Sequence, residues 1–114
     1  MLRQQEILAL KLIFRGEDDL SQAIRVRIHE AKSFNWQETG VGFYSTIKLK
    51  PPLARAPDIR MWEYNFRHPD FPHGGSFMCS VISDNELELE AVALGGACWP
   101  YPTAPEQFKE LGIV

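Results

Sequence analysis

The sequence predicts an α+β fold in which two N-terminal helices pack on one face of a four- to five-stranded antiparallel meander, with a short C-terminal helix. Three observations indicate this class. Apolar residues recur at helical spacing near the N terminus, alternate with polar residues farther along, and are separated there by turn-forming residues. Helices followed by a run of strands are typical of a sheet covered on one face by helices.

The composition is that of an ordinary globular protein, and residues 1–114 are predicted to form a single domain. Twelve Lys and Arg against fifteen Asp and Glu give a net charge of -3, which provides no broad basic surface for nucleic acid and weakly favours basic partners. The longest apolar run, Ile7 to Phe14, is interrupted by Lys11 and is too short to span a bilayer. We therefore expect a cytoplasmic protein that binds neither membranes nor nucleic acid directly.

Two helices are predicted before the strands. The first runs from Arg3 to Arg15, with Ile7, Leu10, Ile13 and Phe14 on its apolar face and Arg3, Gln4, Gln5 and Lys11 away from it. Glu17, Asp18 and Asp19 supply the N-cap and first-turn acids of the second. Its apolar positions are Leu20, Ala23, Ile24, Ile28 and Ala31. The segment from Ile24 to Ile28 also alternates like a strand, so that alternative stays open.

Alternation predicts the first strands. Residues 33–38 form a short strand only if one residue beside Phe34 and Trp36 is irregular. From Val41 to Lys50 the inward positions are Val41, Phe43, Ser45, Ile47 and Leu49. From Ile59 to Phe66, one face carries Trp62, Tyr64 and Phe66, and residues 67–75 are predicted to be a loop.

A hairpin is predicted from Ser76 to Leu94, with Asp84 and Asn85 as a two-residue turn in left-handed conformation. This turn places Ile82 opposite Leu87, Ser80 opposite Leu89 and Met78 opposite Ala91 on an apolar face. The other face sets Val81 and Cys79 against Glu88 and Glu90. After the sheet, a capping box at residues 103–106 predicts a short helix that ends at Leu111.

Glu86, Glu88 and Glu90 form a row of carboxylates on the second hairpin strand. Like charges at this spacing add nothing to sheet stability. Two interpretations are open: a solvated outer face, which is the common case, or a surface that meets cations.

No metal, cofactor or catalytic group is expected. His68, His73, Cys79 and Cys98 are potential zinc ligands, but they lack the usual short spacing between paired ligands. Both cysteines are expected to be reduced packing residues. The glycine pairs at 74–75 and 95–96 do not connect a strand to a helix start, as a phosphate-binding loop does.

Aromatic residues are numerous for so small a sheet. The set is Trp36, Trp62, Tyr64, Phe66 and Trp99. Most are expected in the core, and some at a protein interface, where tryptophan and tyrosine are enriched.

Four short motifs resemble a known group of proteins. They are TGVGFY at 39–44, HGGSF at 73–77, LEA at 89–91 and WP at 99–100. In this order, across roughly residues 20 to 100, they are similar to small bacterial proteins associated with toxin-immunity loci. Ala91 stands where those proteins usually have glycine. The resemblance implies an immunity protein of a contact-dependent growth inhibition or other polymorphic-toxin system, which binds one toxin domain and blocks it.

Two functional hypotheses follow. The first is a non-enzymatic inhibitor whose acidic and aromatic surface covers a cognate toxin domain, and many such toxins are nucleases with basic clefts. Its predicted partner-binding residues are Glu86, Glu88, Glu90, Asp18, Asp19, Trp62 and Tyr64. The second is a small-molecule-binding domain or enzyme with a pocket between the helices and the sheet, lined by Trp62, Tyr64 and His68 or His73.

Overall fold

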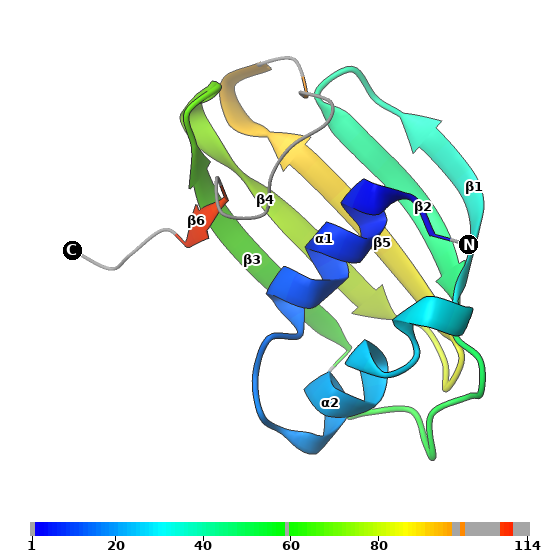
Figure 1. Ribbon diagram of the computed structural model, residues 1–114. Coiled ribbons are helices and arrows are strands. Elements are labelled where there is room, and N and C mark those ends of the chain that lie inside the picture. The colour runs from blue at the N-terminus through cyan, green and yellow to red at the C-terminus, as the bar shows by residue number, and fades with distance from the viewer. Residues whose placement is uncertain (1, 59, 97–98, 100–107, 111–114) are drawn as a thin grey trace.

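The computed structural model describes residues 2–58, 60–96, 99 and 108–110, which form a five-stranded antiparallel sheet with two helices, an α+β fold (Figure 1). The helices are α1 (Gln4–Ile13) and α2 (Asp19–Arg25), followed by a short 3-10 helix, η1 (Ile28–Glu30). The strands are β1 (Lys32–Glu38), β2 (Gly42–Lys48), β3 (Met61–His68), β4 (Phe71–Val81) and β5 (Glu86–Ala93). A second 3-10 segment, η2 (Leu94–Gly96), follows β5, and the two-residue β6 (Lys109–Glu110) extends the sheet beyond β3.

With β6 included, the strand order is β1-β2-β5-β4-β3-β6, so the predicted simple meander is wrong. Strands β3, β4 and β5 do follow one another as hairpins, but β2 pairs with β5 rather than with β3. The segment that joins β2 to β3 carries Pro51, Pro52 and Pro57, which cannot donate ladder hydrogen bonds. It passes along one end of the sheet and delivers the chain to the far edge (Figure 1).

Helix α1 crosses one face of the sheet, here called the inner face (Figure 1). The residues of α1 that face the sheet differ from those predicted. Ile7 is only half-buried, whereas Gln5 and Glu6 are buried. Gln5 accepts a hydrogen bond from Trp99 Nε1, and Glu6 Oε2 accepts one from Ser45 Oγ in β2 at 2.8 Å. Polar groups therefore occupy part of the helix–sheet contact, each with a hydrogen-bond partner.

Helix α2 begins where the acidic residues predicted. Asp18 is its N-cap, and the Asp18 carboxylate accepts hydrogen bonds from Ser21 N at 3.0 Å and Ser21 Oγ at 2.8 Å. These bonds, above all the one from the Ser21 backbone, hold the pKa of the Asp18 carboxyl below its ordinary value. The chain is helical from Asp19 to Arg25, so the strand alternative for Ile24 to Ile28 is wrong.

Strand β1 has the irregular residue that its sequence requires. Asn35 adopts a φ of 52°, and the pairing with β2 shifts between Phe34 and Gln37. This bulge separates the faces of Phe34 and Trp36: Phe34 is exposed, while Trp36 stacks on the buried Phe43 at a centroid distance of 4.5 Å.

The alternation predicted for β2 and β3 is confirmed. Phe43, Ser45, Ile47 and Leu49 are buried, as are Tyr64 and Phe66 in β3, with Trp62 half-buried. Strand β4 begins at Phe71, which pairs with His68 across a short turn. The loop predicted for residues 67–75 is therefore largely strand, with Gly74 at a φ of 72° beside a shift in register.

The β4–β5 hairpin has a different register from the prediction. Val81 pairs with Leu87 and Cys79 with Leu89, which is a shift of one residue. Because side chains alternate, Phe77, Cys79 and Val81 face inward, and Met78 and Ser80 face outward with the glutamates.

The turn is longer than two residues, which explains the shift. Ile82 N donates to Glu86 O at 2.8 Å, so residues 82–85 form the connection. Asn85 N donates to Ser83 Oγ, and neither Asp84 nor Asn85 has a positive φ. Contacts from outside the hairpin fix this loop as well, because Leu49 N donates to Asn85 O and Leu53 N to Asp84 O, each at 2.7 Å.

Aromatic side chains fill the core between α1 and the sheet. Trp99 lies 5.2 to 6.1 Å, centroid to centroid, from its ring neighbours in this cluster. These neighbours are Phe43, Phe66, Phe71, Phe77 and Phe108. Such tilted and edge-to-face pairs add to the stability gained from burial alone.

The predicted C-terminal helix lies mostly outside the described residues. Of its range, Phe108 is described and buried, and Lys109–Glu110 pair with β3 as a strand rather than a helix. In the part of the chain that the structure describes, no helix is both long enough and apolar enough to cross a membrane.

Cys79 is completely buried, as expected for a packing residue, and Cys98 lies outside the described residues. Burial raises the pKa of the Cys79 thiol to about 12. In a Cys98→Ser background, we expect iodoacetamide to leave the native protein unlabelled at mildly alkaline pH and to label it fully in guanidinium, as measured by mass spectrometry. Labelling of the native protein at the rate of a free cysteine would contradict this burial.

Candidate functional site

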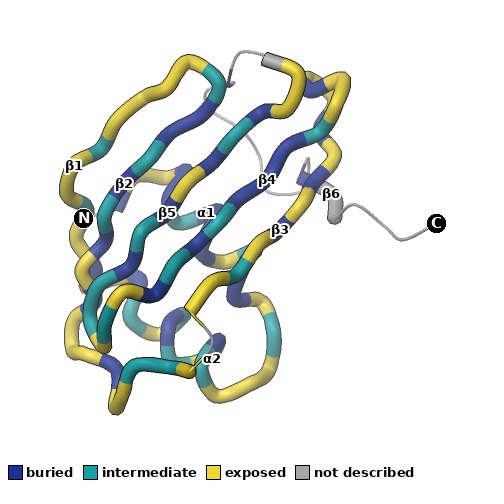
Figure 2. Tube along the Cα trace, turned by 180° about the vertical axis from the view of Figure 1, so that it is seen from behind, coloured by how far each residue is buried: buried dark blue, intermediate teal, exposed yellow. Residues whose placement is uncertain are grey.

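The sheet face opposite α1, here called the outer face, is not covered by any helix of the described chain (Figure 2). Glu86, Glu88 and Glu90 lie along this face on β5, a central strand of the sheet. Glu90 is exposed and the other two are half-buried. The structure thus brings the three predicted carboxylates together on a broad accessible surface.

The neighbouring strands add polar groups beside this row. In β2, Tyr44 pairs with Glu90, Thr46 with Glu88 and Lys48 with Glu86. Burial and the negative charge of Glu88 raise the pKa of the Tyr44 hydroxyl above its ordinary value. The phenol therefore stays protonated at neutral pH and keeps a hydrogen to donate.

Apolar side chains flank the row on its other side. Met61 in β3 is 62% exposed, and Ile82, at the same end of the adjacent β4, is 45% exposed. Arg60 NH1 donates to Val81 O at 3.4 Å and to Ile82 O at 3.3 Å, which ties the two segments together. Exposed methionine and isoleucine beside charged groups give this face the mixed character of a protein interface.

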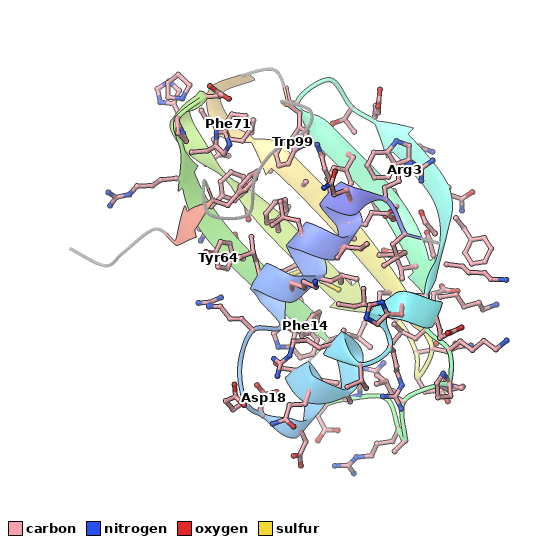
Figure 3. The ribbon with its side chains drawn as sticks, viewed as in Figure 1. Arg3, Phe14, Asp18, Tyr64, Phe71 and Trp99 are labelled. Carbon is pink, nitrogen blue, oxygen red and sulfur yellow. The ribbon has the colours of Figure 1, made fainter. Side chains whose placement is uncertain are left out.

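Asp18, Asp19 and Trp62 meet at a different place. They line a concavity of about 590 Å³ between α2 and the segment of residues 53–58. Figure 3 shows Asp18 beside α2, on the helical side of the sheet. Its carboxylate is engaged by Ser21, so Asp19 and Asp58 are the freer acids at this rim. The acidic residues predicted to bind a partner therefore form two separate surfaces.

Tyr64 lies in the core and leaves little surface for a partner. It is 6% exposed, and its hydroxyl donates to Phe108 O at 3.2 Å. The His68 side chain is also buried, and its Nδ1 accepts a hydrogen bond from Asp70 N at 3.0 Å. The inward alternation of β3 buries both side chains, and His68 packs between the rings of Phe71 and Phe108. Among the described residues, neither of the two concavities found on the surface is lined by Tyr64 or His68.

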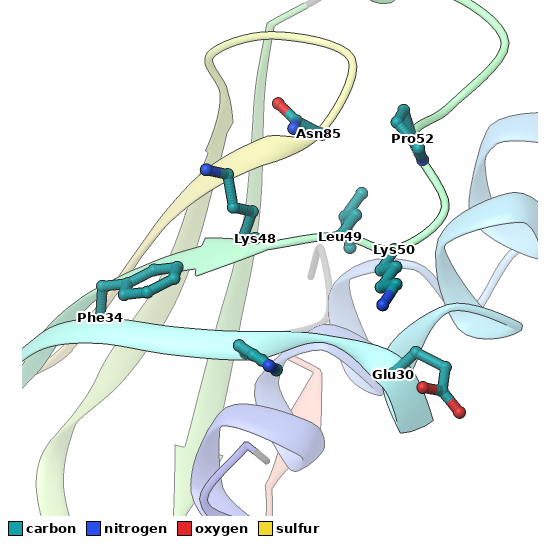
Figure 4. A pocket seen from close by; sticks show the side chains of 8 residues that line it. Glu30, Phe34, Lys48, Leu49, Lys50, Pro52 and Asn85 are labelled. Atoms are coloured by element: carbon teal, nitrogen blue, oxygen red, sulfur yellow. The ribbon is translucent and has the colours of Figure 1, made fainter.

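A third surface was not predicted from the sequence. Lys32, Phe34, Lys48 and Lys50 line a concavity of about 380 Å³ at the end of β1 and β2 (Figure 4). The sequence feature that indicates this basic surface is the run Lys48-Leu49-Lys50 at the end of the alternating strand, together with Lys32, two residues before Phe34. The lysines come together only through the β1–β2 register, which no local feature of the sequence determines.

Comparison of the chain with models of protein families, with curated proteins and with solved structures finds no match. The fold and surfaces define a small α+β domain with one bare, partly acidic sheet face.

Proposed function

We propose that this protein is an immunity protein that binds a cognate bacterial toxin domain and blocks it without catalysing a reaction. The observation that carries the proposal is the bare outer face, with Glu86, Glu88 and Glu90 in a row along β5. The resemblance to proteins of toxin-immunity loci points in the same direction. A row of carboxylates matches the basic clefts of nucleases, where it would occupy the place of substrate phosphates.

The mixed chemistry of the outer face supports protein binding over solvation alone. Met61 and Ile82 provide exposed apolar groups that a partner would bury, and Tyr44 provides a hydroxyl beside the carboxylates. Apolar anchors supply affinity in an interface, while charges mainly set partner choice and the rate of association. The outer face carries both kinds of group, the apolar anchors and the charges.

The ligand-binding alternative rests on the 590 Å³ concavity beside α2. Its polar groups are mainly the carboxylates of Asp19 and Asp58, with Arg55 as the counter-charge. Without Tyr64 or His68 in its lining, it lacks the set of groups on which a catalytic pocket was expected. The outer face is therefore the better supported functional surface.

The test uses the toxin domain encoded beside the gene for this chain. A variant with Glu86→Lys, Glu88→Lys and Glu90→Lys is expected to keep the circular dichroism spectrum of the parent, because none of the three side chains lies in the core and charges that reach solvent contribute little to stability. Its affinity for the toxin should fall by about a hundredfold, with association slowed most at low salt. Surface plasmon resonance and rescue of growth in toxin-expressing cells would measure the loss.

A matched control reverses three exposed acids elsewhere. Glu17→Lys, Glu30→Lys and Glu38→Lys change the net charge by the same amount away from the β5 row. This control should retain rescue and most of the affinity. Equal losses in the two triple variants would attribute the effect to net charge and contradict a specific outer-face interface.

A further inference from the structure

Three lysines surround the 380 Å³ concavity at the end of β1 and β2. Lys32 and Lys48 are direct cross-strand partners, so two positive charges lie opposite each other on the same face. Like charges in this arrangement destabilise a sheet. Lys50 adds a third cation at the rim.

No ion pair joins these lysines to an acidic residue in the described part of the chain. Glu86 is the cross-strand neighbour of Lys48, yet the two form no ion pair. Glu30 also lines the concavity, and Figure 4 places it at the opposite end from Phe34. Beside Phe34, the cross-strand pair Lys32 and Lys48 places two positive charges together, with Glu86 as the neighbouring carboxylate on the next strand. An anion bound between the two lysines would relieve their mutual repulsion.

Hydrogen bonds hold the wall of the concavity in place. Arg27 Nε donates to Pro51 O at 2.8 Å, and Arg27 NH2 donates to Pro52 O at 3.3 Å. On the other side, Leu49 N donates to Asn85 O at 2.7 Å. A wall fixed in this way lowers the entropy cost of binding a ligand.

Phe34 supplies an apolar surface in this basic site. Its side chain is 46% exposed, because residues 32–34 pair regularly with β2 and strand alternation places Phe34 on the outer face with Lys32. Lys48 Nζ lies 5.9 Å from the centre of the Phe34 ring. An exposed ring next to ammonium groups is the combination with which proteins hold a planar base and its phosphates together.

We propose that this concavity binds a nucleoside diphosphate, with the base stacked on Phe34 and the phosphates held by Lys32 and Lys48, while Lys50 at the rim adds to the positive potential. The concavity is at the small end of the range for ligand sites, which suits one nucleotide rather than an oligonucleotide. This site has the opposite charge to the proposed toxin-binding row and does not depend on that function.

The experiment is an NMR titration of the full chain with ADP, with adenosine and with pyrophosphate. ADP should shift the amide signals of residues 32–34 and 48–50 in a saturable manner. Pyrophosphate should bind the same residues more weakly because it cannot stack, and adenosine more weakly because it lacks phosphates. Absence of saturable shifts at these residues with millimolar ADP would overturn the proposal, and so would pyrophosphate that binds as tightly as ADP.

Variants separate the two contributions. Lys32→Gln with Lys48→Gln should weaken ADP binding by about tenfold or more, while the melting temperature stays equal or rises, because the like-charge pair is gone. Phe34→Ala should remove the advantage of ADP over pyrophosphate. Lys11→Gln, an exposed change on α1, is the control and should bind ADP as the parent does. Undiminished ADP binding by the double lysine variant would refute the site.

Discussion

Replacing Gly42 with alanine is expected to prevent folding or to lower the free energy of unfolding by more than about 4 kcal/mol. A Cβ atom at this position would lie 1.8 Å from the backbone carbonyl oxygen of Ala91 in β5. A backbone atom cannot rotate away as a side chain can, so β2 and β5 would have to separate. Their pairing is the link between β1–β2 and the rest of the sheet, so the loss would extend to the whole fold.

Gly40, two residues away, is the matched control. It has a φ of +84°, and no atom lies within 4 Å of the place where its Cβ would be. Gly40→Ala should therefore cost only the strain of a left-handed conformation, about 1 to 2 kcal/mol, and Gly40→Asn less. Urea denaturation followed by circular dichroism measures both. If Gly42→Ala were as stable as Gly40→Ala, the close approach of β2 and β5 would be incorrect.

The strand positions that were predictable are those in long alternating segments. For the segment from Val41 to Lys50, only one orientation of the strand buries most of the apolar side chains, and β2 adopts that orientation. In the segment from Phe77 to Ile82, by contrast, both possible faces contain apolar residues: Phe77, Cys79 and Val81 on one, Met78 and Ile82 on the other. The register was therefore decided by the four-residue turn and by its contacts with Leu49 and Leu53, which lie far from the hairpin in sequence.

The strand order was not predictable for a similar reason. Consecutive strands usually lie side by side, and that tendency favoured a β2–β3 pair. The proline-containing segment between β2 and β3 is long enough to reach either edge of the sheet. The pairing of β2 with β5 depends on the whole set of contacts rather than on any local signal.

The candidate sites show the same division between local and long-range information. The spacing of Glu86, Glu88 and Glu90 places them on one face of any regular strand, so their common surface followed from the sequence. Whether that face would be bare depended on where α1 packs. The lysine site required Lys32 and Lys48 to be cross-strand partners. Tyr64 is buried although the sequence predicts it at a partner surface, because an aromatic residue suits a core and an interface equally well.

Replacing Ser45 with alanine is expected to lower the free energy of unfolding by about 2 to 3 kcal/mol, a large effect for the loss of one hydroxyl. Ser45 and Glu6 are both fully buried, and Ser45 Oγ donates to Glu6 Oε2 at 2.8 Å. The other carboxylate oxygen, Oε1, accepts from Arg3 N at 2.8 Å. Without the serine, a buried carboxylate oxygen loses this donor in a place that water does not reach, which costs more than the bond itself is worth.

Ser76 provides the matched control for this prediction. It is also buried, but its hydroxyl donates at 3.3 Å to Glu63, whose carboxylate is exposed and can turn to water. Ser76→Ala should therefore cost less than about 1 kcal/mol. The double variant Glu6→Leu with Ser45→Ala should recover most of the stability lost in Ser45→Ala, because an apolar pair needs no donor. Chemical denaturation of the four proteins gives the comparison. Equal losses of stability in Ser45→Ala and Ser76→Ala would contradict the prediction. They would mean that the Glu6 carboxylate reaches another donor or solvent, and that the hydrogen bond to Ser45 is not the main polar contact between α1 and β2.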